Sequence, residues 1–543
     1  MPKKTTIAVC AIALLASSSI AQEHQHGTNA KLGTVHFATS CNPAAQNEVD
    51  RAVALLHSFQ FSDAIQSFDA ARKRDATCGI AYWGIALSDW SNPFAPGMKD
   101  KNQLQAGRES AERGKAAGAK TMRERDYIVA VGNLYGKFES TPQQARLVAY
   151  RDAMATVASK YPRDDEAQIF YALALAAAEE PTDKSYAARL KAGAILEKLF
   201  RKEPNHPGLA HYIIHTYDVP PLADKALVAA RRYSDIAPDA PHALHMPSHT
   251  FTRVGYWQDS IDSNIAAAAA SRREGQTAEE LHASDYQVYA YLQTAQDQAA
   301  RKLVEAVPEM ASRFDPKVVV SGAAPPAAGY FALAAIPARY ALERGDWQQA
   351  ANLEPRATPF PHTDAMTWFA RGMAAARLHD VAKAQASVAA LEEIRTRLKN
   401  AKEDYWAGQV EIQRLEVNAW SLLAEGHKDE ALTTIKSAAA MEDLTEKSAV
   451  TPGPLAPARE LFGEMLLEVS QPAQALDQFE ATLKKEPNRF RTLYGAARAA
   501  QLSGNREASR KYFAELLKVC EHADKPGRPE LQEATKAGAE TSN

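Results

Sequence analysis

The histidines of this sequence gather in one stretch with a regular spacing. His211 and His215 are four residues apart, and the same holds for His245 and His249. In a helix, residues at positions i and i+4 lie on one face about one turn apart. The two pairs are also 34 residues apart, both from 211 to 245 and from 215 to 249. Neighbouring helices pack roughly 8–10 Å apart, which would bring four imidazoles together.

Three more histidines and two carboxylates lie close to these pairs in the sequence. His206 and His242 come just before or at the start of the two predicted helices, and His282 begins the next one. Asp218 and Asp285 follow the histidines and add carboxylate oxygens. We expect all of these side chains to lie near one patch.

Such a set of side chains is suited to metal binding. Neutral imidazoles spaced i, i+4 on paired helices can supply three or four nitrogens to one ion. Zinc or copper suits nitrogen-rich ligands, whereas iron or nickel is possible with a carboxylate added. The alternative is that these are buried histidines, satisfied by backbone carbonyls and neighbouring Tyr or Asp side chains. The predicted ligands of a divalent transition metal are His206, His211, His215, His242, His245, His249, His282, Asp218 and Asp285.

Pro247 is a second unusual feature of the same stretch. It falls past the first turn of a predicted helix, where it removes a backbone hydrogen bond and should kink the helix. Local irregularity beside a polar cluster often marks a working site. The sequence has no glycine-rich phosphate loop, no Gly-x-Ser-x-Gly turn and no Cys-x-x-Cys pair. No nucleophile can be named, so the sequence favours a binding protein over an enzyme.

Composition indicates an all-α protein. Long stretches rich in Ala, Leu and Glu have helical spacing, and no clear run of alternating β-branched residues appears. The formal net charge of -3 and the pI near 6.6 give no basic surface for nucleic acid or anionic lipid. We expect neither as a partner.

The first residues resemble a secretory signal. Lys3 and Lys4 precede an apolar run over residues 7–16, and small residues at Ser19 and Ala21 fit a cleavage site. We therefore predict a signal peptide over residues 1–21, an N-terminal extension over 22–44, and an exported protein that is periplasmic or secreted. No later segment is apolar enough to span a bilayer.

Three cysteines remain after signal removal. Cys41 precedes the first predicted helical hairpin and Cys78 follows it, so a disulfide between them would close that hairpin in an oxidising compartment. Cys520 would be left over, as a buried thiol or an intermolecular partner. The alternative is three free buried thiols.

A repeated helical pattern covers most of residues 45–518. Ala64, Phe68 and Ala71 have the small and aromatic spacing that lets two antiparallel helices pack closely, and similar copies begin at Gly345, Gly426 and Pro472. This pattern and the 34-residue period resemble the tetratricopeptide repeat family, in a type found in exported bacterial proteins. The resemblance implies an all-α solenoid of stacked helix pairs, in one array or in two sub-arrays. Its expected segments are an array over 45–314, a Pro/Gly/Ala linker over 315–328, an array over 329–522 and a polar tail over 523–543.

The resemblance also implies where function should be sought. In the family, the helix face that carries these histidines lines a concave groove, and the groove holds a peptide or protein partner. The leading hypothesis is an exported scaffold with a histidine-lined metal or ligand site in its groove. One alternative is a metal-dependent enzyme, a hydrolase or an oxidoreductase, whose metal keeps an open coordination position. The other is a purely structural array.

Overall fold

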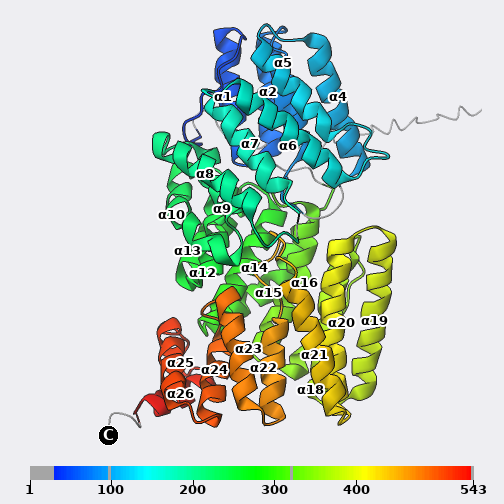
Figure 1. Ribbon diagram of the computed structural model, residues 1–543, viewed down its shortest axis with the longest axis vertical. Coiled ribbons are helices and arrows are strands. Elements are labelled where there is room, and N and C mark those ends of the chain that lie inside the picture. The colour runs from blue at the N-terminus through cyan, green and yellow to red at the C-terminus, as the bar shows by residue number, and fades with distance from the viewer. Residues whose placement is uncertain (1–29, 96–98, 181, 318–321, 540–543) are drawn as a thin grey trace, which may run out of the picture. The chain divides into compact units, whose positions relative to one another are not determined.

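The protein is all-α. The computed structural model describes residues 30–95, 99–180, 182–317 and 322–539, and every secondary-structure element within these ranges is a helix (Figure 1). The predicted signal peptide and the start of the N-terminal extension lie outside them. From Lys31 onward the chain forms one compact unit. No helix in the described ranges combines the length and apolar character that a membrane span requires.

The first helices pack in sequential pairs, as the repeat pattern predicts. A Cβ added at Gly84 would lie 2.1 Å from the ring of Phe68, so the small residue is what allows the two helices to approach. Cys41 and Cys78 flank the first pair and form a disulfide whose Cα atoms are 5.0 Å apart. The elements here are α1 (Pro43–His57), α2 (Phe61–Arg74), α3 (Ile80–Trp90), α4 (Lys101–Ala117), α5 (Met122–Val131), the 3-10 helix η1 (Gly132–Leu134), α6 (Gln143–Lys160), α7 (Asp165–Ala177) and α8 (Ala187–Lys202).

The histidine-bearing helices follow. Pro247 interrupts one of them as expected, because α11 ends at His245 and α12 starts at Pro247 itself. Helices α11 and α12 then pack together against α13. The elements of this part are α9 (Pro207–Thr216), the 3-10 helix η2 (Pro220–Ala226), α10 (Leu227–Ile236), α11 (Pro241–His245), α12 (Pro247–Val254), α13 (Trp257–Arg273), α14 (Thr277–Gln293), α15 (Asp297–Arg313) and α16 (Pro326–Glu343).

The remaining helices continue the paired packing. The ring of Phe479 on α23 fits against Gly463 on α22 and Gly495 on α24, where an added Cβ would lie 2.9 and 2.4 Å from it. These elements are α17 (Trp347–Ala351), α18 (Pro361–Arg377), α19 (Val381–Asn400), α20 (Asp404–Ala424), α21 (Lys428–Asp443), α22 (Ala458–Glu468), α23 (Pro472–Lys485), α24 (Phe490–Leu502), α25 (Arg506–Val519) and α26 (Pro529–Ala539).

Helix packing extends past two of the expected segment boundaries. Helices α14 and α16, which lie on the two sides of the predicted linker, pack extensively on each other. The expected tail over 523–543 contains α26, whose Leu531 and Ala534 are buried. The helix forms because these two residues, at i and i+3, share a face that packs on α25.

A non-helical segment, residues 445–457, connects α21 to α22 and is called the strap here. It lies against helices from earlier in the chain. Lys184 Nζ donates to the carbonyl of Thr445 at 3.0 Å, Tyr286 Oη to that of Thr451 at 3.1 Å, and an Arg339 guanidinium nitrogen to that of Gly453 at 2.9 Å. The helix face that the sequence predicts as an open groove is therefore covered here by the chain's own backbone.

Candidate metal centre

Six of the seven predicted histidines lie together in the interior. They come from α9, α11, α12 and α14, and each is between 0% and 6% exposed. In an open groove these rings would contact water, so burial is the main difference from the sequence-based expectation. The six are His211, His215, His242, His245, His249 and His282.

The six imidazoles form two groups of three. The first triad is His211, His215 and His242, and the second triad is His245, His249 and His282; within each, one ring nitrogen per residue lies within 4.8 Å of the others. Three imidazole nitrogens at this range are a common ligand set for zinc and copper.

The two triads adjoin one another. The ring centroids of His215 and His249, one from each triad, are 6.0 Å apart. Those of His242 and His245 are 6.1 Å apart, and both residues belong to the short helix α11. Two ions held by the two triads would therefore be close neighbours.

Hydrogen bonds fix the orientation of the second triad. His245 Nδ1 lies 2.7 Å from Asn264 Oδ1, and His249 Nδ1 lies 3.0 Å from Asp218 Oδ2. The Asn264 amide nitrogen donates to the Ser260 carbonyl, so Oδ1 is the acceptor toward His245. Both oxygens only accept, so both Nδ1 atoms carry the proton. A neutral imidazole then presents a bare lone pair at Nε2.

These two lone pairs face each other. His245 Nε2 and His249 Nε2 are 3.1 Å apart. Burial lowers the pKa of both rings, which disfavours an imidazolium that would donate a proton from one ring to the other. Two bare lone pairs at this distance repel, whereas one cation would attract both. Tetrahedral zinc with Zn–N bonds of roughly 2.0–2.1 Å separates its ligand nitrogens by about 3.3 Å, close to the observed spacing.

The first triad has ring nitrogens that no protein group satisfies. His211 Nδ1 donates to the carbonyl of His57 at 2.6 Å, which leaves its Nε2 as a lone pair. Among the described residues, His211 Nε2, His215 Nε2 and both nitrogens of His242 have no hydrogen-bond partner. Buried polar atoms are almost always paired. Metal ligation would satisfy three of the four unpartnered nitrogens at once.

Apolar surroundings keep these rings neutral. Phe94 stacks on His215 with centroids 4.4 Å apart, and Tyr233 stacks on His211 at 5.2 Å. Burial lowers the pKa of His211 and of His282 to about 3. Protons therefore compete weakly for these nitrogens near neutral pH, which favours metal binding.

Asp218 lies behind the second triad and outside it. Its carboxylate accepts from His249 Nδ1, from Arg253 Nε at 2.8 Å and from Lys447 Nζ at 3.4 Å. Although burial opposes the charge, Lys447 and Arg253 hold the pKa of Asp218 well below its ordinary value. The structure therefore places Asp218 against His249 Nδ1 and outside the two triads, in the position that carboxylates behind metal-bound histidines commonly take.

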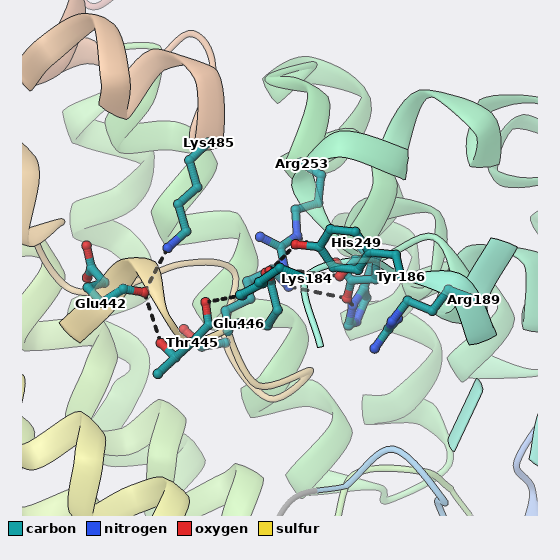
Figure 2. A network of polar contacts seen from close by, with 12 residues as sticks. Lys184, Tyr186, Arg189, His249, Arg253, Glu442, Thr445, Glu446 and Lys485 are labelled. Atoms are coloured by element: carbon teal, nitrogen blue, oxygen red, sulfur yellow. Dashed lines mark hydrogen bonds and ion pairs between the residues drawn. The ribbon is translucent and has the colours of Figure 1, made fainter. Parts of the chain in front are cut away.

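A wider polar network connects this carboxylate to the strap (Figure 2). Arg253, which binds Asp218, lies 3.9 Å from Glu446 Oε2. The other carboxylate oxygen of Glu446 accepts from Lys184 Nζ at 2.6 Å and from Tyr186 Oη at 2.7 Å. The backbone of Val450 in the strap lies beside His282 of the second triad and partly offsets the lowering of its pKa by burial. The strap is thus part of the wall that buries the histidines.

Asp285 is the second predicted ligand that the structure places elsewhere. It follows His282 by three residues on α14, but its carboxylate accepts from Arg339 Nε of α16 at 2.7 Å. The pair is completely buried. A guanidinium on the neighbouring helix satisfies the charge, so Asp285 takes no part in the triads.

His206 also lies outside the two triads, in a third group with His57 and Glu166 whose possible ligand atoms lie within 4.8 Å of one another. Its Nε2 lies 3.0 Å from Glu166 Oε1, and the other oxygen of Glu166 lies 3.0 Å from His57 Nε2. Both imidazoles hold the pKa of Glu166 well below its ordinary value, although burial opposes this. His57 lies on α1 and Glu166 on α7. No regular spacing in the sequence relates them to His206, so the sequence does not predict this contact. This third group connects to the first triad because the carbonyl of His57 orients His211.

A cavity of about 520 Å³ lies beside the triads. His215 and His242 of the first triad line it, together with His249 and His282 of the second. The rest of the lining includes Met246, Ala328, Phe360, Trp406 and Val450. A small molecule in this cavity could reach nitrogens of both triads.

Comparison with known proteins gives distant structural likenesses. No protein-family model matches the chain, and no curated protein matches it. The chain is similar to the human IFIT1 dimer with m7Gppp-AAAA, at 11% identity over 89% of this chain and 96% of that one, with a TM-score of 0.37. It is similar to the P58(IPK) TPR domain at 14% identity over 70% of this chain and 99% of that one, with a TM-score of 0.21. It is similar to yeast Tom70 at 10% identity over 92% of this chain and 96% of that one, with a TM-score of 0.28. These likenesses concern the arrangement of helices and carry nothing about the histidines.

Proposed function

We propose that this protein binds two transition-metal ions, zinc or copper, one in each histidine triad, inside an array of tetratricopeptide-type helix pairs. The observation that carries the proposal is the pair of His245 and His249 Nε2 atoms at 3.1 Å. Both Nδ1 protons are committed to oxygens, so a cation is the partner that both lone pairs can share. The unpartnered nitrogens of the first triad support a second ion.

A purely structural role explains these residues less well. It accounts for the Nδ1 atoms, which donate to Asn264, to Asp218 and to the carbonyl of His57. It accounts less well for the Nε2 atoms. Those of His211 and His215 have no hydrogen-bond partner among the described residues. Those of His245 and His249 face each other, and the hydroxyl of Tyr286, 3.4 Å from His249 Nε2, already donates to the carbonyl of Thr451. Burial of such atoms costs roughly 1–3 kcal/mol each, so an array selected only for stability would replace them with apolar residues.

A peptide in the groove is also less favoured at this position. The strap already packs on the face where a peptide would bind, and its carbonyls are held by Tyr286 and Arg339. The disulfide between Cys41 and Cys78 supports the related proposal that the protein works outside the cytosol, because such bonds persist in oxidising compartments.

The experiment is a metal count on protein purified without a metal-affinity tag. The chain is stripped with a chelator and titrated with Zn²⁺ or with Cu⁺ under anaerobic conditions, and bound metal is measured by mass spectrometry. We expect two ions per chain, one in His211→Ala/His215→Ala, and one in His245→Ala/His249→Ala. The exposed His427→Ala variant is the matched control and should keep both. Equal metal content in all four proteins would contradict the proposal.

A further inference from the structure

The cavity beside the triads gives the proposed centre an opening for an external ligand. Four of the six imidazoles line it, two from each triad, whereas His211 and His245 lie outside the lining. A closed structural site would be surrounded by protein on all sides. A molecule in this cavity could instead approach both ions at once.

The walls of the cavity favour a flat apolar molecule. His362 and Trp406, which stack with ring centroids 3.9 Å apart and planes 4° apart, both line the cavity and give it aromatic surface. Met246, Phe360 and Val450 add hydrocarbon surface. The volume of about 520 Å³ lies within the range of small-molecule sites, roughly 300–1,000 Å³. A single substituted aromatic ring would fit with room to turn.

The ligand set favours copper and electron transfer over hydrolysis. Both triads are built from imidazoles alone, which suit either oxidation state of copper better than they suit hard cations. A metal-bound water that attacks an ester or amide usually works with a carboxylate base. Asp218 is engaged with His249 and Arg253, and Glu279 Oε1, which lies 3.9 Å from His242 Nδ1, accepts from the backbone N–H groups of Ala323 and Ala324. Two other carboxylates, Asp100 and Glu403, line the cavity, and Asp100 accepts from backbone N–H groups at the start of α4.

We propose, on the basis of the function proposed above, that the centre is a dicopper site that reduces dioxygen and oxidises a small dihydroxyaromatic compound bound in the cavity. Two adjacent Cu(I) ions give one electron each to one dioxygen, which becomes a peroxide bridging two Cu(II) ions. A first diphenol gives two electrons and two protons, the O–O bond breaks, and one water and one quinone leave. A second diphenol gives two electrons and two protons, a second water and quinone leave, and both ions return to Cu(I).

The test uses the full chain loaded with Cu(I) in the absence of air. On exposure to dioxygen we expect a peroxide-to-copper absorption band in the near ultraviolet and no Cu(II) signal in electron paramagnetic resonance, because adjacent Cu(II) spins couple. With catechol present, one dioxygen should be consumed for every two quinones formed. The Ala327→Trp variant fills the cavity from its wall and should keep both copper ions and the dioxygen band. Its catechol turnover should fall by about a hundredfold, since a displaced substrate loses its reactive geometry. Leu502→Trp, which adds a similar ring at an exposed position away from the cavity, is the matched control and should keep full turnover.

The outcomes separate this inference from the proposed function. Chains that bind two copper ions but show the full signal of isolated Cu(II) and no dioxygen band would overturn the dicopper inference and leave metal binding intact. A dioxygen band without catechol oxidation would overturn the substrate class. Full catechol turnover in Ala327→Trp would overturn the cavity as the substrate site. Chains that bind no copper would overturn both proposals.

Discussion

Asn264 controls the second triad without contacting the proposed ion. Its Oδ1 accepts from His245 Nδ1 at 2.7 Å, and its amide nitrogen donates to the carbonyl of Ser260. The side chains of Asn264 and His245 are both buried. In the Asn264→Ala variant, His245 loses the acceptor that holds its proton on Nδ1, so the ring no longer presents a committed lone pair at Nε2.

The loss of metal affinity in Asn264→Ala has two physical measures. A buried N–H left without an acceptor costs roughly 1–3 kcal/mol, and at about 1.4 kcal/mol per factor of ten this is roughly 5- to 150-fold in an equilibrium constant. Removal of hydrogen-bond partners behind metal ligands typically costs about 10- to 100-fold in affinity. We therefore expect Asn264→Ala to weaken one of the two ions by about 10- to 100-fold.

The assay is a competition titration against a chelator, analysed for two sites. Only the ion in the second triad should weaken, so the first triad serves as an internal control in the same molecule. The mutation should also have no further effect in a His245→Ala background, because it acts through that ring. Equal weakening of both ions, or a full additional loss in the double variant, would refute the assigned role of Asn264.

Three other features of the chain have measurable consequences. Replacing Cys41 and Cys78, 37 residues apart, with Ser should lower the free energy of unfolding by about 3–4 kcal/mol in chemical denaturation without reductant; no difference there would contradict the loop-closure reasoning. Burial raises the pKa of Glu416 above its ordinary 4.5, so the folded chain holds a proton that the unfolded chain releases, and its stability should fall as pH rises past 4.5. Glu416→Gln should remove this loss, about 1.4 kcal/mol per unit of pKa shift, and parallel stability curves for the two proteins from pH 4 to 8 would contradict it. Gly495→Ala places a Cβ 2.4 Å from the Phe479 ring and should lower the melting temperature, at a cost of about 1–3 kcal/mol; an unchanged melting temperature would show that the ring can shift freely.

The repeat register predicts the core of the site because it is a local property. His211 and His215 lie on one helix, and the 34-residue period places His245 and His249 in the corresponding positions of the next repeat, on the consecutive helices α11 and α12. The position of the pairs next to each other then follows from helix packing. All-α architecture is predictable for the same reason, since helical spacing is visible within short windows of sequence.

The parts that were missed depend on contacts between distant segments. Asp285 lies three residues from His282, but an arginine 54 positions later takes its charge. His206 contacts Glu166, and the residue pattern of α7 does not predict that contact. The strap, which buries the triads, comes from residues 445–457 and has no repeat pattern. Side-chain direction and long-range partners are thus what the sequence leaves open.

The helical repeat itself explains why there are two triads and why they adjoin. Each triad consists of a histidine pair and one further histidine from the start of the next repeat: His242 completes the first triad and His282 completes the second. Helix α7, which packs on α8 in the pair before α9, contains no histidine, so His206 has no pair to complete and lies against Glu166. Helix α11 carries His242 of one triad and His245 of the other, three residues apart. This five-residue helix ties the two sites together, so their separation is set by a single rigid turn and not by the flexibility of the whole array.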